Sequence, residues 1–358
     1  MLAVSGHGYG HAVRCAEVAS ALRRRGARVV VRSDAPTWLF PADVEWIPSP
    51  GWPLDIGAVQ QGGLELDVDE TRRQWQAFAA EFDARAEVEA RLLRQARADI
   101  VVADIPPLAF AAAARAGVPA LGLTNFTWDW IYAAWPDFET IVAGIRAAYA
   151  QARGLLRLPL HGPCDAFARI EDVPLVARRA RRSRDAVRVL LGLPATAPVV
   201  LLSFGAFTAR GLDLGSLGRW RNYLFLVTPP SAPDEAGLPA NVRILNETPV
   251  DYVSLLAACD VVVTKPGYGI VSDCLANRVA VLFTERGPFR EYDVLAEALP
   301  RLGRARHVSR EQLIAGKIGA DLDALLASDA AWTEQPLNGA DCVAERVLDR
   351  VTIEQSLG

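Results

Sequence analysis

Asp99-Ile-Val-Val-Ala-Asp104-Ile-Pro and Asp260-Val-Val-Val-Thr-Lys265-Pro-Gly are two similar segments, one in each half of the chain. Each begins with an aspartate, continues as an apolar strand pattern, and ends in a proline turn before a helical pattern. The next apolar strand patterns begin at Val118 and Val279, the same distance downstream in both halves. Short apolar strands separated by helices are typical of parallel sheets covered on both faces. The spacing therefore predicts an α/β fold with two doubly wound, Rossmann-like domains, although two generic β-α-β units could coincide in this way.

The rest of the chain extends this alternation of strands and helices. Further strand patterns lie at 2–5 and 28–32 in the first half and at 198–203, 223–227 and 241–245 in the second. A charged amphipathic pattern over 70–96 predicts one long helix. Proline-punctuated sequence between Leu155 and Arg178 predicts the domain boundary. We assign 1–160 to an N-terminal domain, 161–345 to a C-terminal domain and 346–358 to a C-terminal tail.

Composition argues against several classes of protein. The 358 residues carry a formal net charge of -4, which gives no reason to expect a nucleic-acid partner. No apolar run approaches the roughly 20 residues of a membrane span, and no secretory leader precedes the first strand. We therefore expect a cytoplasmic protein and leave peripheral membrane association open. Because a strand pattern follows Met1 directly, the natural start could lie upstream of it.

Two charged motifs and the cysteines have ordinary structural interpretations. The five cysteines form no C-x-x-C pair and do not combine with the four histidines at zinc spacing, so reduced, mostly buried thiols are expected. Asp67-Val-Asp69 resembles a short metal-binding acidic motif, but it precedes a helical pattern, where carboxylates favour the helix dipole. The run Arg178–Arg184 is interpreted as a solvated helix face. The sequence thus predicts neither a metal nor a cofactor.

A glycine-rich loop, Ser5-Gly-His-Gly-Tyr-Gly-His11, follows the first strand and opens a helix. Alternate glycines allow a tight turn and the close approach of a ligand, and a helix N-terminus favours negative charge. The pattern departs from the dinucleotide fingerprint in its third glycine, and the acidic residue after the second strand is at best Asp34. A nicotinamide enzyme is therefore only weakly supported.

Two of the four histidines, His7 and His11, flank this loop, and Asp104 ends the strand expected beside the first one. Ligands of open α/β sheets bind where the strand order reverses, so these three side chains are expected to meet. A carboxylate beside an imidazole fixes its tautomer and raises its basicity, as a general base requires. The alternative for Asp104 is a cap of the following helix, with Pro106 in its first turn.

The second half offers a counterpart in Thr264-Lys-Pro-Gly-Tyr-Gly-Ile-Val-Ser-Asp273. A glycine-rich turn that opens a helix exposes amide donors suited to a diphosphate, and Lys265 adds positive charge. Asp273 lies one turn into the helix, where it could accept hydrogen bonds from a ribose diol. Ser203-Phe-Gly205 ends the first strand of this half and could add phosphate contacts. Together these features favour a nucleotide site.

Aromatic residues gather after the strand at 118–123, in Asn125-Phe-Thr-Trp-Asp-Trp-Ile-Tyr132. Aromatic rings with nearby amides suit sugar or lipid acceptors, but a loop that packs on the core explains the pattern equally well.

The motifs resemble a known group of proteins. Gly6-His-Gly-Tyr-Gly-His-Ala-Val-Arg14 is similar to the opening loop of the glycosyltransferase-like domain at the front of plant arabinokinases and related bacterial proteins. Lys265–Asp273 and Phe289-Arg-Glu-Tyr292 resemble its second-domain loops, and Asn125–Asp129 matches a further segment. More distantly, the pattern resembles the peptidoglycan N-acetylglucosaminyltransferase and the plant UDP-glucosyltransferases. The chain lacks the arabinokinase kinase domain, so kinase activity is not implied.

This resemblance implies a GT-B fold, with two Rossmann-like domains facing a central cleft and the C-terminal tail packed on the first domain. It implies His11 and Asp104 as catalytic residues, an acceptor held by the first domain, and a donor nucleotide held by the second near Asp273 and Glu291. Together with the motifs above, the expected catalytic residues are His11, His7 and Asp104. The expected acceptor side comprises Gly8, Tyr9, Gly10, Asn125, Trp128 and Asp129. The expected donor side comprises Ser203, Gly205, Lys265, Gly267, Tyr268, Gly269, Asp273, Arg290 and Glu291.

The function expected from the residues and the resemblance is inverting, metal-independent transfer of a sugar from a nucleotide-sugar, expected to be a UDP-sugar, to an acceptor hydroxyl. The nucleotide-sugar is then a substrate rather than a cofactor. Because the longer plant donor signature is missing, the nucleobase stays open. Two alternatives remain: a nucleotide-sugar epimerase of the same fold, and a non-catalytic protein that binds a nucleotide-sugar or a partner.

Overall fold

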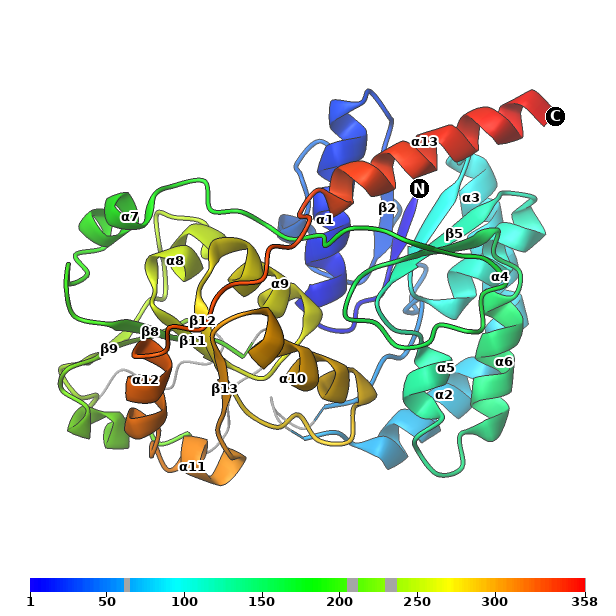
Figure 1. The fold of residues 1–358 in the computed structure, drawn as a ribbon. Coiled ribbons are helices and arrows are strands. Elements are labelled where there is room, and N and C mark those ends of the chain that lie inside the picture. The colour runs from blue at the N-terminus through cyan, green and yellow to red at the C-terminus, as the bar shows by residue number, and fades with distance from the viewer. Residues whose placement is uncertain (61–64, 205–211, 229–236, 358) are drawn as a thin grey trace. The chain divides into compact units, whose positions relative to one another are not determined.

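The computed structural model describes residues 1–60, 65–204, 212–228 and 237–357. Within these residues the chain divides into two compact units, each considered separately below (Figure 1). Unit 1 contains residues 1–59, 66–177 and 336–358, and unit 2 contains residues 60–65 and 178–335. The division at Ala177 falls later than the expected boundary at 160, because a further strand at 170–172 pairs with the sheet of unit 1.

Unit 1 is built on a sheet of parallel strands in the order β3-β2-β1-β4-β5-β6-β7. The strands are β1 (Leu2–Val4), β2 (Val30–Ser33), β3 (Glu45–Trp46), β4 (Val101–Asp104), β5 (Ala120–Thr124), β6 (Gly154–Arg157) and β7 (Ile170–Asp172). The helices are α1 (Tyr9–Arg24), η1 (Thr37–Leu39), α2 (Val68–Ala80), α3 (Phe82–Gln95), α4 (Pro107–Ala116), α5 (Trp128–Tyr132), α6 (Glu139–Tyr149) and α13 (Gly339–Leu357).

Unit 2 repeats this plan with the parallel order β10-β9-β8-β11-β12-β13. Its strands are β8 (Val199–Leu202), β9 (Leu224–Val227), β10 (Val242–Ile244), β11 (Val261–Thr264), β12 (Ala280–Phe283) and β13 (Ala305–His307). Its helices are α7 (Arg184–Leu190), η2 (Gly215–Arg219), α8 (Tyr252–Ala258), α9 (Tyr268–Asn277), α10 (Arg290–Leu302), α11 (Arg310–Ile314) and α12 (Gly319–Leu326).

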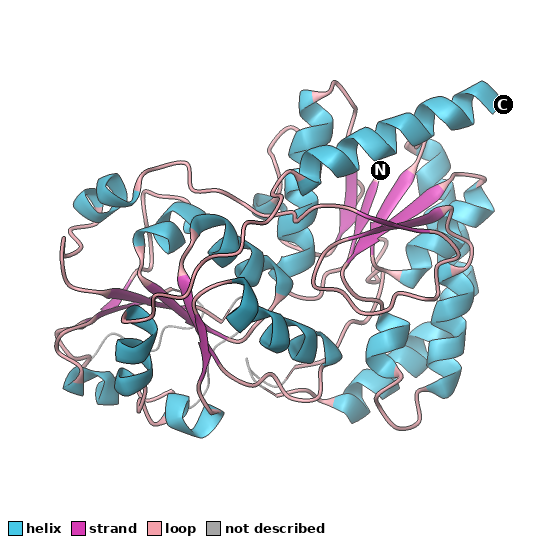
Figure 2. Cartoon of the chain, viewed as in Figure 1, coloured by secondary structure: helices cyan, strands magenta, loops and turns pink. Residues whose placement is uncertain are grey.

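The central strands are apolar and fully buried because helices cover both faces of each sheet (Figure 2). In unit 1 the strand order reverses between β1 and β4, and in unit 2 it reverses between β8 and β11. These are the Rossmann positions at which open α/β sheets bind ligands, beyond the carboxyl ends of the strands. The prediction of two doubly wound α/β domains is therefore confirmed.

Three helical segments refine the expectations from sequence. The single helix expected over 70–96 is two helices, α2 and α3, which meet at Glu81. Asp67 caps α2 by accepting a hydrogen bond from the Glu70 amide (2.8 Å), which agrees with the helix-start interpretation. The run 178–184 is not a helix face, because α7 begins only at Arg184.

The C-terminal helix α13 belongs to unit 1 and packs on α1. Arg25 near the end of α1 bonds Asp341 (2.6 Å) and Glu345 (3.2 Å) of α13. These ion pairs are exposed and contribute little, so apolar packing of α13 holds it in place.

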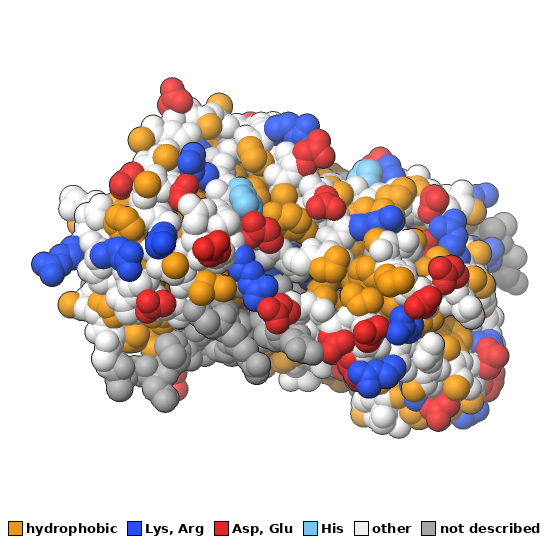
Figure 3. All heavy atoms as spheres, turned by 90° about the horizontal axis from the view of Figure 1, so that it is seen from below, with side chains coloured by type: hydrophobic (Ala, Val, Ile, Leu, Met, Phe, Trp, Pro, Cys, Tyr) orange, Lys and Arg blue, Asp and Glu red, His pale blue; other side chains and the backbone are white. Residues whose placement is uncertain are grey.

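On the face shown in Figure 3, acidic and basic side chains alternate without forming a single extended basic area. None of the described helices is long and apolar enough to cross a membrane.

Candidate functional sites

The glycine loop of unit 1 connects the end of β1 with the start of α1. Val4 of β1 pairs with Asp104 at the end of β4, so the loop leaves the sheet where the strand order reverses. Gly8 adopts a φ of 69°, which disfavours any other residue. A Cβ added at Gly8 or Gly10 would meet no described atom within 4 Å. Protein packing therefore does not explain Gly10, and the space beside the start of α1 suits a ligand.

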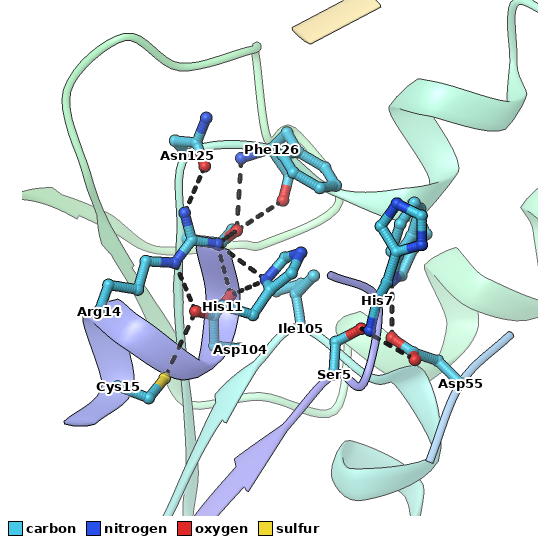
Figure 4. A network of polar contacts seen from close by, with 12 residues as sticks. Ser5, His7, His11, Arg14, Cys15, Asp55, Asp104, Ile105, Asn125 and Phe126 are labelled. Atoms are coloured by element: carbon cyan, nitrogen blue, oxygen red, sulfur yellow. Dashed lines mark hydrogen bonds and ion pairs between the residues drawn. The ribbon is translucent and has the colours of Figure 1, made fainter. Parts of the chain in front are cut away.

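His11 and Asp104 form a buried pair at this point. The imidazole Nδ1 lies 2.8 Å from the Asp104 Oδ1, and the two residues are 4 % and 0 % exposed (Figure 4). Burial by itself raises the pKa of Asp104, but the charge of Arg14 and the contacts with Arg14 and His11 outweigh it and hold that pKa at about 2. Asp104 is therefore ionised at neutral pH and orients the His11 ring.

Arg14, which was not among the predicted site residues, holds both oxygens of Asp104. Its Nε and Nη2 donate to Oδ2 and Oδ1 at 2.5 and 2.6 Å, and its Nη1 donates to the Asn125 Oδ1 at 2.6 Å. Arg14 lies three residues after His11, so both side chains project from one face of α1. This bidentate contact fixes the carboxylate more firmly than the histidine alone could.

His7 occupies a different place from His11. Its Nδ1 accepts a hydrogen bond from the Ala58 amide (3.2 Å), and its own amide donates to the Ser5 Oγ (3.2 Å). Its ring meets the Trp128 ring edge-on, with centroids 5.3 Å apart. The expectation that both histidines meet Asp104 thus fits His11, whereas the contacts described for His7 are with Ser5, the 57–58 segment and Trp128.

Asp55 is a second buried carboxyl group beside the glycine loop, and it was not predicted. It accepts hydrogen bonds from the Ser5 hydroxyl (2.9 Å) and the Trp128 indole (2.8 Å). Burial raises its pKa to about 6, against the opposing influence of His11. No sequence motif marks Asp55, because it lies in an irregular segment far from the loop that it supports.

The predicted acceptor platform at 125–129 is instead part of the core. Asn125, Trp128 and Asp129 are 0 %, 0 % and 2 % exposed. Each of these side chains bonds within the protein: Asn125 to Arg14, Trp128 to Asp55, and Asp129 through its Oδ2 to Arg146 (2.7 Å). Of the two interpretations left open, packing on the core is the one that the structure shows. Tyr9, by contrast, is half-buried and meets the exposed ring of Trp38 edge-on at 5.6 Å.

In unit 2 the predicted donor turn lies between β11 and α9. Gly267 caps α9, so Tyr268 and Gly269 occupy its first turn, where amide groups lack acceptors within the helix. Lys265 is buried and donates to the Gln60 Oε1 at 2.9 Å. Burial and, to a smaller extent, the nearby charge of Arg286 lower its pKa to about 6, against the opposing influence of Glu291. Lys265 is thus placed to gain charge when an anion binds.

Arg286 is a second cation at this turn, again missed by sequence reasoning. Its Nη1 lies 2.7 Å from the Glu291 Oε2 and 4.0 Å from the Cβ position of Gly267. Its guanidinium lies over the Phe289 ring at 4.1 Å. Glu291, expected to contact the donor, accepts this hydrogen bond from Arg286. Arg290 begins α10, beside this pair in sequence.

Asp273, the predicted ribose ligand, is engaged by Arg178. The Arg178 amide donates to Oδ1 (3.0 Å), and its Nη2 and Nε donate to Oδ2 (2.5 and 3.1 Å). Both carboxylate oxygens therefore already accept hydrogen bonds from the protein, and Asp273 is buried. Ser203 exchanges a hydrogen bond with the Tyr252 hydroxyl (2.8 Å). Gly205 lies outside the described residues.

Comparison with solved structures defines the architecture. The glycotransferase of kitacinnamycin superposes with a TM-score of 0.62 at 17% identity, covering 98% of this chain and 94% of that chain. UGT89C1 of Arabidopsis thaliana, complexed with UDP, gives a TM-score of 0.59 at 17% identity, covering 97% and 94%. The chain has the GT-B fold that these proteins share.

Sequence comparison gives a more specific resemblance. L-arabinokinase of Arabidopsis thaliana is 33% identical over 364 residues, which cover 98% of this chain and 34% of that protein. The resemblance to arabinokinases inferred from the motifs is thereby confirmed, and the chain spans about a third of the relative's length. No protein-family model matches the chain.

Proposed function

We propose that this protein transfers a sugar from a nucleotide-sugar to an acceptor hydroxyl by a single displacement that inverts the anomeric centre. The observation that carries the proposal is the buried His11–Asp104 pair at the point where the strand order of unit 1 reverses. Imidazole oriented by carboxylate is the arrangement that a general base requires. The GT-B fold and the UDP complex of a similar structure support a nucleotide-sugar as donor.

The acceptor step begins with proton removal by His11. With Nδ1–H directed at Asp104, the Nε2 lone pair takes the proton of the acceptor hydroxyl as its oxygen attacks the anomeric carbon. The bond between that carbon and the diphosphate oxygen breaks, and its electron pair leaves with the diphosphate. Asp104 stabilises the imidazolium that forms, while Arg14 keeps the carboxylate in place.

Charge on the leaving diphosphate is met by Lys265, Arg286 and the first-turn amides of α9 in this proposal. Two cations and a helix N-terminus act together on developing negative charge, which lowers the barrier without proton transfer to the leaving group. Turnover that persists in EDTA would agree with stabilisation by protein groups alone.

A thermal-shift panel of UDP-, dTDP- and GDP-sugars tests the donor. A ligand that binds only the folded state raises the melting temperature by mass action. We expect one nucleobase class to stabilise the protein selectively, and that donor then serves in assays of UDP, dTDP or GDP release with hydroxyl acceptors. Failure of every nucleotide-sugar to stabilise the protein would contradict the proposal.

The products distinguish the alternatives. Free nucleoside diphosphate together with a glycosylated product indicates transfer. Interconversion of two nucleotide-sugars without an acceptor indicates an epimerase. Saturable binding with neither reaction indicates a non-catalytic binding protein.

Donor binding is expected to weaken as the pH rises. Free Lys265 has a pKa of about 6 and is largely neutral above it, whereas a bound diphosphate favours the charged form and raises that pKa. Binding therefore takes up a proton between the two pKa values. Over this range the affinity should fall by up to about tenfold per pH unit. Calorimetry with a nucleotide-sugar, in buffers of different ionisation enthalpy, measures both the affinity and the proton uptake.

Lys265→Met is the matched control for this pH dependence. It retains the apolar stem but cannot take up a proton, so its weaker binding should be nearly independent of pH and of buffer. An unchanged pH dependence in this variant would assign the proton uptake to another group.

A further inference from the structure

The hydrogen bond to His7 determines which of its nitrogens carries the proton. A backbone amide can only donate, so the Nδ1 that accepts from the Ala58 amide must carry a lone pair. Neutral His7 then carries its proton on Nε2. While this bond persists, Nδ1 carries no hydrogen.

The protein holds the His7 ring in this orientation. Gly57 has a φ of 64°, and a Cβ added there would lie 2.7 Å from the Cβ, Cγ and Nδ1 of His7. The absence of a side chain at Gly57 therefore makes room for the imidazole, which also packs edge-on against Trp128. Ala58, whose amide fixes the tautomer, directly follows this glycine.

His11 has the opposite tautomer. A carboxylate can only accept, so the His11 Nδ1 that faces the Asp104 Oδ1 carries a hydrogen, and in the neutral ring the lone pair is then on Nε2. Arg14 Nη2 also lies 3.0 Å from this Nδ1. The two hydrogens of Arg14 Nη2, however, have better acceptors in the Asp104 Oδ1 (2.6 Å) and the Thr124 Oγ1 (3.1 Å). The contact with Arg14 therefore does not change the tautomer assigned to His11.

We propose that His7 is a hydrogen-bond donor to a lone-pair oxygen of the substrate, not a second general base. This inference rests on the proposed function and gives His7 a role different from the expected sharing of proton removal with His11. The two histidines of the loop then have different roles. His11 Nε2 takes a proton from the attacking hydroxyl, and His7 Nε2–H donates a hydrogen bond that positions a neighbouring oxygen of the substrate. His7 is thus a positioning residue for substrates that carry an oxygen beside the reacting group, as polyols and sugars do.

Nitrogen NMR tests the tautomers without any substrate. The chain has four histidines, so long-range 1H–15N spectra of the labelled protein can be assigned with single substitutions. At neutral pH we expect His7 with its proton on Nε2 and His11 with its proton on Nδ1. A proton on Nδ1 of His7 would overturn the proposal, whether or not the protein proves to be a transferase.

Glycine variants test the cause of the orientation. Gly57→Ala should displace the ring and abolish the Nε2–H signature of His7. Gly117→Ala introduces a Cβ at a similar φ of 72°, but in open space, and should leave that signature unchanged. Equal spectra for the two variants would contradict the role assigned to Gly57.

Two substitutions test the role in turnover, measured as kcat/KM for nucleoside diphosphate release from the donor that stabilises the protein most. Glutamine can place an amide donor near the position of Nε2, so His7→Gln should stay within about tenfold of wild type. Phenylalanine fills the volume without a donor, so His7→Phe should fall by about tenfold to a hundredfold. Equal losses in both variants, or wild-type activity in His7→Phe, would refute donation by His7. If wild type releases no diphosphate, the proposed function fails and the NMR tautomer alone decides whether His7 presents a donor.

Discussion

Replacing His11 by alanine is expected to lower turnover by roughly a thousandfold, because general-base catalysis by a positioned side chain contributes about 10² to 10⁴. No other described group is placed to substitute for it in the proposed mechanism, since His7 carries its proton on the nitrogen away from Ala58. The measurement is kcat for nucleoside diphosphate release at saturating donor and acceptor.

Donor binding provides the internal control for this variant. His11 belongs to unit 1, whereas Lys265, Arg286 and the first turn of α9 belong to unit 2. The thermal shift that the donor produces should therefore be nearly the same in His11→Ala and wild type. Undiminished turnover in the variant would remove His11 from the mechanism, and lost donor binding would indicate a structural defect instead.

The pair of His11 and Asp104 could be predicted from sequence because topology alone brings them together. Apolar strand patterns identify the parallel strands, and adjacent parallel strands place their carboxyl ends at one edge of the sheet. Loop residues directly after β1 and β4 must then be neighbours, although 93 positions separate His11 from Asp104. Arg14 was also within reach of this reasoning, since it follows His11 at helical spacing.

Other features could not be predicted because they depend on contacts with no local signal. The break between α2 and α3 at Glu81 interrupts no apolar stripe, since Trp75, Phe78 and Ala86 continue at helical spacing across it. Asp55 and Gly57 lie in irregular structure, where periodicity carries no information. In the sequence, Arg178 is one member of a basic run. Only its contact with Asp273 in the folded protein distinguishes it from the other arginines of that run.

The aromatic segment after β5 shows the limit of composition as a guide to binding. Aromatic rings serve equally as binding platforms and as core, and burial decides between them. Trp128 is fully buried, yet its ring edge still shapes the site by packing on His7. Its contribution to function is therefore indirect, through the orientation of a neighbouring side chain.

Replacing Arg14 by methionine is expected to destabilise unit 1 by about 3–5 kcal/mol, because removal of one partner leaves a buried charge uncompensated. The Asp104 side chain is fully buried and would lose two of its hydrogen bonds, both from a guanidinium that is itself 2 % exposed. Urea unfolding at neutral pH, followed by circular dichroism, measures the loss.

The pH dependence of this loss identifies its cause. In wild type the pKa of Asp104 is about 2, below the ordinary value of 3.8, so its stabilising contribution is present above pH 3.8 and is lost as the pH falls through 2. Without Arg14, burial would raise that pKa, and protonation would relieve the penalty as the pH falls. The difference between the two proteins should therefore shrink towards pH 4. Arg25→Met is the matched control, since it removes an arginine from the other end of the same helix but breaks exposed ion pairs with α13 and one hydrogen bond to the Ala21 carbonyl, and leaves no buried charge. It should leave the unfolding midpoint almost unchanged, and an equal loss in both variants would show that Asp104 is not the source of the effect.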